Sequence, residues 1–129
     1  MALLKDLHHV AVICSDYERS KAFYTEVLGL ELMSEHYRED SQSYKTDLGL
    51  NGRYLVELFS FPAPPARVSH PEAAGLRHLA FLVDNVEEVV KQMEAKGVKC
   101  EAIRVDSYTG KHFTFLADPD NLPIELYGF

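Results

Sequence analysis

The sequence predicts an α+β fold built from two tandem βαβββ modules. Its 129 residues are the size of one ordinary domain, and 47% hydrophobic with 26% charged residues is typical of a globular protein. Short β-branched runs alternate with helix-like stretches, and their order in the first half recurs in the second. We therefore expect a single domain over residues 1–129, with module one at about 1–61, a linker at about 62–75 and module two at about 76–129.

The first module begins with a strand over residues 7–14, which is short, β-branched and apolar at alternating positions. Ser15 and Glu18 form a capping box that predicts a helix from this point to Leu28. Three strands are expected after the helix, at 30–38, 41–50 and 53–61. The last two are joined by Asn51-Gly52, the strongest two-residue hairpin signal.

A proline-rich stretch at 61–75 separates the modules as a linker or lid, because proline cannot donate a hydrogen bond to a sheet. The second module then repeats the order of the first. It has a strand over 76–83 and a helix that is capped by Asp84 and ends near Lys96. Its remaining strands are expected at 98–106, 111–117 and 123–129.

Two His–Glu pairs follow the same repeat. His78 comes 69 positions after His9, and Glu125 comes 68 positions after Glu57. Each glutamate has apolar neighbours in the last strand of its module, where an ionised carboxylate requires a partner. Two imidazole nitrogens and two carboxylates suit one divalent metal ion, such as nickel, zinc, manganese, cobalt or iron, with water or substrate completing the shell.

The other histidines and the two cysteines are not expected to join this site. His8 adjoins His9, but on a strand it points to the opposite face. A lone histidine is more often packed or hydrogen-bonded than a ligand, and this applies to His36, His70 and His112. Cys14 and Cys100 have no metal-ligand spacing and are expected to be buried thiols.

Charge and hydropathy exclude several classes of partner. The formal net charge is -7, which disfavours binding to a nucleic-acid backbone. No apolar run is long enough to span a bilayer, and the N-terminus lacks the pattern of a signal peptide. We therefore expect a cytoplasmic protein that acts on a small molecule, with no nucleic acid or membrane partner.

The chain resembles the vicinal oxygen chelate superfamily, also called the glyoxalase, bleomycin resistance and dioxygenase superfamily. The resemblance covers essentially the whole chain. It rests on LHHVAV at 7–12, SKAFY at 20–24 with Leu28-Gly29, RHLAF at 77–81, and Asp118-Pro119-Asp120 leading to Glu125-Leu126. It implies that the modules form a curled, half-open mixed sheet around a divalent metal, in the glyoxalase-like fold. It also implies that two chains pair as a homodimer.

The order His, Glu, His, Glu is similar to the metal shell of glyoxalase I in this superfamily. The resemblance therefore implies that His9, Glu57, His78 and Glu125 are the metal ligands. It further implies a lactoylglutathione lyase-like lyase or isomerase, acting on a small oxygenated substrate or its thiol adduct. Glu57 or Glu125 would be the catalytic base, moving a proton between neighbouring carbons through a metal-bound enediolate.

The sequence departs from the family pattern at two places. Glutathione-dependent members carry a basic residue four positions after the first ligand, where this chain has Ile13. Other sources of positive charge are Arg38, Lys45 and Arg53. In the Asp-Pro-Asp turn Asn121 replaces the usual glycine, and asparagine tolerates the left-handed backbone conformation required there.

Three other functions stay open on this evidence. Ring-cleaving dioxygenases and thiol transferases of the same superfamily use two His and one Glu, so the additional Glu57 argues against both. A metal-free protein of the bleomycin-resistance type would sequester a ligand in a dimer groove. Such proteins usually lack the metal residues, whereas all four are present here.

Overall fold

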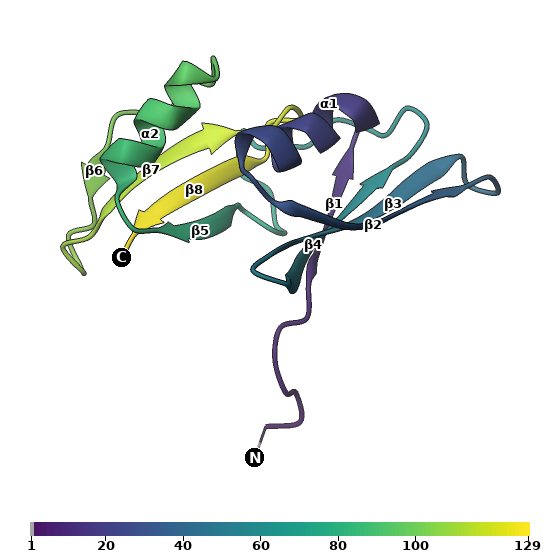
Figure 1. The fold of residues 1–129 in the computed structure, drawn as a ribbon, viewed down its shortest axis with the longest axis horizontal. Helices are drawn as coiled ribbons and strands as arrows, with labels where there is room; N and C mark the ends of the chain where they lie inside the picture. Colours follow the sequence, from purple (N-terminus) through teal and green to yellow (C-terminus); the bar gives the residue numbers. More distant parts are fainter. Residues whose placement is uncertain (1) are drawn as a thin grey trace. The chain divides into compact units, whose positions relative to one another are not determined.

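The computed structural model describes residues 2–129 and divides into two compact units, one ending at Pro65 and the other beginning at Ala66. Each unit contains one strand, a helical segment and three further strands (Figure 1). The strand orders are β1-β4-β3-β2 and β5-β8-β7-β6, so the two sheets have the same topology. The predicted α+β fold of two βαβββ modules is confirmed.

Unit 1 is a mixed sheet in which β1 runs parallel to β4 and the other pairs are antiparallel. Its elements are β1 (Val10–Cys14), α1 (Tyr17–Ala22), the π-helical turn η1 (Phe23–Val27), β2 (Glu31–Arg38), β3 (Ser43–Leu50) and β4 (Arg53–Ser60). The first strand begins at Val10 rather than at residue 7. His8 and His9 therefore precede the strand, and strict alternation between its faces does not apply to them.

The N-cap of each helix lies one residue later than predicted. Asp16 Oδ1 accepts a hydrogen bond from Arg19 N at 3.2 Å, and Asn85 Oδ1 accepts one from Glu88 N at 3.0 Å. Both capping residues have extended backbone angles, which lets the side chain reach the amide three residues on. The predicted caps, Ser15 and Asp84, were wrong by one position.

The two faces of the unit 1 sheet have different surroundings. Its buried core includes Val12, Cys14, Leu48, Val56 and Leu58. On α1, Tyr17 lies parallel to Tyr44 of β3, with ring centroids 3.9 Å apart. Alternation along β4 places Glu57 on the opposite, partly exposed face.

The hairpin between β3 and β4 forms as predicted, with φ of 51° at Asn51 and 77° at Gly52. The register of β3 shifts between Leu48 and Gly49, and Gly49 lies opposite Tyr54.

A methyl group at Gly49 would lie 2.2 Å from the carbonyl oxygen of Arg53 and 2.7 Å from Met33 Sδ. Because the nearer atom is backbone, it cannot rotate away. We expect Gly49→Ala to reduce the free energy of unfolding by about 3 kcal/mol. Chemical denaturation would measure the change, and a loss below about 0.5 kcal/mol would contradict the close approach.

Unit 2 repeats the mixed sheet, with β5 parallel to β8. Its elements are β5 (Leu79–Val83), α2 (Val86–Ala95), β6 (Arg104–Val105), β7 (His112–Ala117) and β8 (Pro123–Gly128). The strand predicted over 98–106 is reduced to two residues. Glu101 accounts for part of this, because its carbonyl accepts from the Thr114 hydroxyl at 2.7 Å instead of from a strand amide.

The turn before β8 forms around Asp118, whose Oδ1 accepts from Asp120 N at 2.9 Å and Leu122 N at 2.8 Å. Asn121 has a φ of 66°, so asparagine supplies the left-handed conformation as predicted. This turn leads into β8, whose alternation puts Glu125 on the partly exposed face of the sheet. The buried positions of unit 2 include Val86, Met93, Leu116, Ile124 and Leu126.

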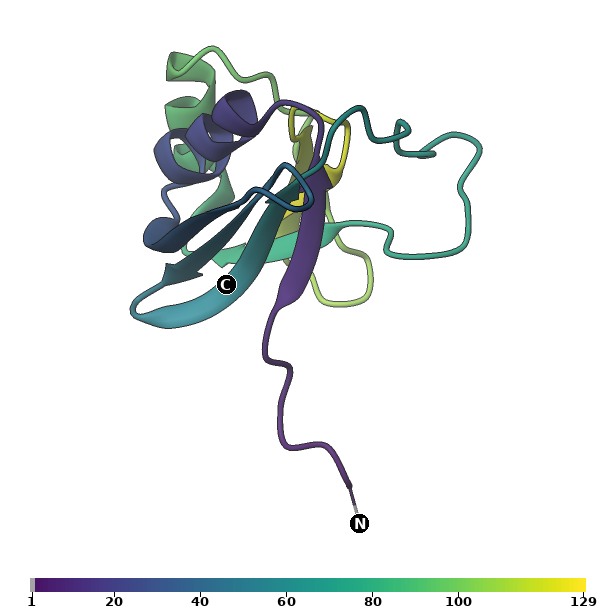
Figure 2. The same cartoon turned by 90° about the vertical axis from the view of Figure 1, so that its right-hand side faces the viewer.

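The loop between β4 and β5 leads into unit 2 as a long excursion without regular structure (Figure 2). Cys14 and Cys100 are both buried as predicted, and neither forms a disulfide among the described residues. Burial raises the pKa of the Cys100 thiol. Within residues 2–129, every helix is too short or too polar to cross a membrane.

Candidate metal centre

The first predicted pair of ligands comes together at the start of the unit 1 sheet. Ala11 pairs with Glu57 across β1 and β4, and His9 lies two residues before Ala11, just ahead of the strand. His9 Nε2 is 3.4 Å from Glu57 Oε1. The Glu57 side chain is only 12% exposed, so its carboxylate depends on partners within the protein.

The second pair has the same construction in unit 2. Ala80 pairs with Glu125 across β5 and β8, and His78 lies two residues before Ala80. His78 Nε2 is again 3.4 Å from Glu125 Oε1. The equal separations show that the repeat predicted from sequence spacing extends to the arrangement of the side chains.

The geometry of each pair fits two ligands of one metal ion. A separation of 3.4 Å is longer than a good N–H···O hydrogen bond. Nitrogen and oxygen ligands at about 2.1 Å from a tetrahedral ion lie about 3.4 Å apart. Over residues 2–129, no group of three or more His, Cys, Asp or Glu side chains is assembled for a metal. Each pair thus supplies two donors.

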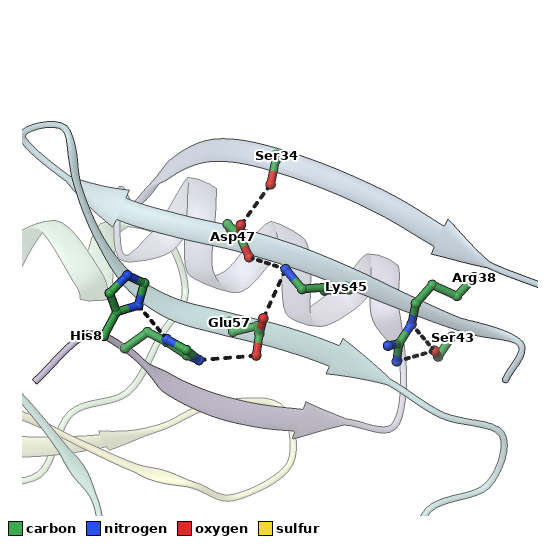
Figure 3. A network of polar contacts seen from close by, with 8 residues as sticks. His8, Ser34, Arg38, Ser43, Lys45, Asp47 and Glu57 are labelled. Carbon is green, nitrogen blue, oxygen red and sulfur yellow. Dashed lines mark hydrogen bonds and ion pairs between the residues drawn. The ribbon is translucent and has the colours of Figure 1, made fainter.

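Charged side chains surround Glu57 (Figure 3). Lys45 Nζ lies 3.0 Å from Glu57 Oε2 and 3.0 Å from Asp47 Oδ1. Ser34 donates to Asp47 at 3.0 Å. The hydrogen bond to Glu57, followed by that to Asp47, raises the pKa of Lys45. One Glu57 oxygen is therefore held by a charged lysine while the other faces His9.

Burial raises the pKa of Asp47, but hydrogen bonds from Lys45, Ser34 and Tyr54 outweigh that cost and hold it below the ordinary value. Asp47 stays ionised and keeps Lys45 in place near neutral pH. Lys45 and Asp47 are therefore both charged near neutral pH.

Tyr54 covers the other side of His9. Their rings are stacked, with centroids 4.9 Å apart. Burial, more than the neighbouring Asp47 carboxylate, raises the pKa of the Tyr54 phenol. Its hydroxyl is buried beside the Asp47 carboxylate.

Aromatic side chains, rather than charges, surround Glu125. Phe115 lies directly opposite it across β7 and β8, and the Phe115 ring contacts His78 edge to face at 5.2 Å. Phe113 stacks with Tyr127 farther along the same face. Within the part of the chain that is described, no lysine or arginine forms an ion pair with Glu125. Glu125 is therefore less constrained than Glu57.

The outward-facing nitrogens of the two candidate histidines have different partners. His8 Nδ1 lies 2.8 Å from His9 Nδ1, so His8 orients His9. The expectation that His8 stays apart was wrong, because both residues precede β1. In unit 2, Arg77 Nη1 lies 3.3 Å from His78 Nδ1.

These partners favour different tautomers. Arginine only donates, so its contact places the neutral proton of His78 on Nε2, the atom that faces Glu125. His8 can accept from His9 Nδ1, which leaves His9 Nε2 available as a metal ligand. The unit 1 contacts therefore favour the tautomer that a metal ligand requires, whereas binding through His78 Nε2 requires the proton to leave that atom and the Arg77 contact to give way.

We therefore expect opposite effects on metal affinity from these neighbours. His8→Ala should weaken binding about 10–100-fold, the usual cost of losing an outer partner of a ligand. Arg77→Met should leave affinity unchanged or increase it, because it removes a competing donor. Competition against a coloured chelator would measure both, with Arg53→Met as the control. Equal weakening by His8→Ala and Arg77→Met would contradict the assignment.

The alternative basic residues named from the sequence lie in three different settings. Lys45 contacts the candidate ligand Glu57. Arg38 lies over the Phe59 ring at 5.1 Å and donates to Ser43. Arg53 faces Asp6 at 3.8 Å. Of the three, only Lys45 reaches a candidate ligand.

Comparison with known proteins places this geometry in a family. Residues 6–126 match the Glyoxalase/Bleomycin resistance protein/Dioxygenase superfamily. The uncharacterized protein YaeR of Escherichia coli is 60% identical over 96% of this chain and 96% of its own. The uncharacterized protein YwkD of Bacillus subtilis is 59% identical over 97% of this chain and 98% of its own.

Solved structures agree in fold. A glyoxalase family protein from Enterococcus faecalis has a TM-score of 0.89 and 46% identity, covering 98% of this chain and 99% of its own. A trypanothione-dependent glyoxalase I of Leishmania major has a TM-score of 0.72 and 28% identity, and the match covers 97% of this chain and 87% of its own. Among curated relatives, lactoylglutathione lyase of Schizosaccharomyces pombe is 29% identical over 93% of this chain but only 46% of its own length.

Proposed function

This chain belongs to the Glyoxalase/Bleomycin resistance protein/Dioxygenase superfamily, and from that premise we propose that it is a metal-dependent lyase or isomerase. It moves a proton between neighbouring carbons of a small oxygenated substrate or its thiol adduct. The observation that carries the proposal is the His–Glu pair repeated at 3.4 Å in both units. Relatives named lactoylglutathione lyase and methylmalonyl-CoA epimerase support this class of reaction.

The proposed ligands of one divalent ion are His9, Glu57, His78 and Glu125. Their two imidazoles and two carboxylates suit nickel, zinc, manganese, cobalt or iron. When bound, the ion supplies a Lewis acid that stabilises negative charge developing on the substrate oxygens. The two pairs contribute two ligands each.

The surroundings of the glutamates divide the roles between them. Glu57 is the fixed ligand, because the Lys45 ammonium holds its second oxygen at 3.0 Å. Glu125 is the base. It takes a proton from the carbon beside the substrate carbonyl and returns it to the neighbouring carbon. Among the described residues no lysine or arginine pairs with Glu125 to restrain its movement. Phe115, opposite Glu125, helps to keep water from the reacting carbons.

We also propose that two chains pair, in the cytoplasm, to form the working enzyme. Ile13 on β1 is 55% exposed and Leu82 on β5 is 67% exposed. Both lie on edge strands, where a protein partner would cover apolar surface and unpaired backbone groups. The proposal does not specify which thiol forms the substrate adduct, because Ile13 occupies the position of the basic residue in glutathione-dependent members.

The proposal is tested with the full chain loaded separately with nickel, zinc, manganese, cobalt and iron(II). Methylglyoxal is supplied alone, with glutathione and with other small thiols, in deuterated water. We expect product from at least one thiol adduct of methylglyoxal, and loss of turnover when a chelator removes the metal. Deuterium should enter the product at the reacting carbon unless the proton transfer is fully shielded from solvent. Ligand binding with no turnover for any ion would instead favour the sequestering protein. Oxygen uptake with iron alone would favour a dioxygenase.

A further inference from the structure

Unit 2 contains a cavity that the proposed metal ligands do not use. It has a volume of about 280 Å³ and lies between the loop that precedes β5 and the outer part of the sheet. Its lining includes three arginines, two glutamates and one aromatic ring: Arg67, Arg77, Arg104, Glu72, Glu101 and Phe115. A second hollow of about 530 Å³ shares Arg67, Glu101 and Phe115 with it.

The charge of this cavity is opposite to that of the chain. Arg77 pairs with Glu72, and Arg104 Nη2 lies 3.1 Å from Glu101. Arg67 has no ion-pair partner among the described carboxylates. The lining therefore carries excess positive charge in a protein whose net charge is -7. An anion is the ligand that this excess would attract.

Arg67 is fixed in place although it lacks a counter-ion. Its Nη2 donates to the carbonyls of Leu76 at 2.8 Å and Arg77 at 2.9 Å, and its Nε donates to Ser69 at 2.9 Å. Ser69 in turn donates to the Asn121 carbonyl at 3.1 Å. These bonds tie the loop to the turn before β8, so the cavity is held by specific contacts.

The cavity adjoins the proposed metal ligands of unit 2. The Phe115 ring that lines it contacts His78 at 5.2 Å and lies opposite Glu125 in the sheet. The Arg104 guanidinium lies 5.8 Å from the centre of the same ring. Arg77 spans both regions, because it pairs with Glu72 and contacts His78. A ligand whose reacting oxygens lie near His78 could therefore extend across Phe115 to the arginines.

We propose that this cavity binds an anionic group, a carboxylate or phosphate, at the far end of the substrate. The inference rests on the proposed function and narrows its substrate to an oxygenated molecule with an acidic tail. Arginine suits this role because its planar N–H donors match the oxygens of a carboxylate or phosphate.

The first test uses the anion alone on the metal-free full chain. Inorganic phosphate and glutarate are titrated while backbone amide shifts are recorded by NMR. We expect the shifts to centre on residues 67–77 and 101–104, and Arg104→Met to weaken binding about 10-fold. Arg53→Met, an exposed arginine of unit 1, is the control and should bind as the wild type does. Scattered shifts, or equal binding by Arg104→Met, would overturn the proposal. The probe that binds more tightly, inorganic phosphate or glutarate, shows whether the cavity prefers a phosphate or a carboxylate group.

The second test connects the cavity to the metal. Acetohydroxamate and succinic monohydroxamate chelate metals through the same two oxygens, but only the second carries a carboxylate tail. On the metal-loaded wild type we expect the tail to strengthen binding about 10-fold, and this gain to vanish in Arg104→Met. Equal binding of both probes by the wild type would overturn the proposal that the cavity binds an acidic tail of the substrate. It would leave the proposed function standing. Binding of neither would argue against the proposed function, while the phosphate and glutarate titrations would still decide whether the cavity takes anions.

Discussion

Replacing Glu125 by Gln is expected to lower turnover by about 10²–10⁴-fold, the usual contribution of a general base. The substitution preserves size and hydrogen bonding, and Glu125 forms no ion pair with lysine or arginine among the described residues, so the fold should be retained. The measurement is kcat at saturating metal and substrate, with unfolding followed in parallel. Unchanged turnover would contradict the assignment of Glu125 as the base.

Glu57→Gln provides the matched comparison. Glu57 is held by Lys45 and faces His9, so its loss should mainly weaken metal binding, and excess metal should restore much of the turnover. The two variants separate the base from the fixed ligand. If excess metal rescued Glu125→Gln but not Glu57→Gln, the two roles would be reversed.

The second large effect is expected from removing either histidine. His9→Ala and His78→Ala each remove one proposed ligand, whereas loss of an outer partner such as His8 costs about 10–100-fold in affinity. We therefore expect each ligand variant to lose more than 100-fold. Competitive chelator titration would measure this, with His36→Ala as the control. Retention of affinity in either variant would remove that histidine from the shell.

Much of the fold could be predicted from the sequence. Strand order follows from hydrophobic alternation and from turn residues such as Asn51-Gly52, which act locally. The His–Glu pairs could be predicted because equal sequence offsets in two similar modules place residues at equal positions. The shortened β6 could not, because it depends in part on the Thr114 hydroxyl donating to the carbonyl of Glu101, a contact between residues that are distant in sequence.

The surroundings of the candidate ligands were less predictable for the same reason. The contact of His8 with His9 depends on where β1 begins, which propensity does not set to within a residue. Tyr54 stacks on His9 across 45 positions of sequence, because the pairing of Val10 with Val56 brings the start of β4 beside the residues that precede β1. Lys45 was named for its charge, but its contact with Glu57 follows from the register of β3 on β4.

The most direct test of the central claim is the number of metal ions bound per chain. Elemental analysis would be applied to the wild type and to His9→Ala and His78→Ala after identical reloading. If both His–Glu pairs serve one ion, the wild type will hold about one ion per chain and each variant will hold almost none. Two ions per chain, with each variant losing one, would show two separate sites. No specific metal in any of the three would contradict a metal-dependent enzyme.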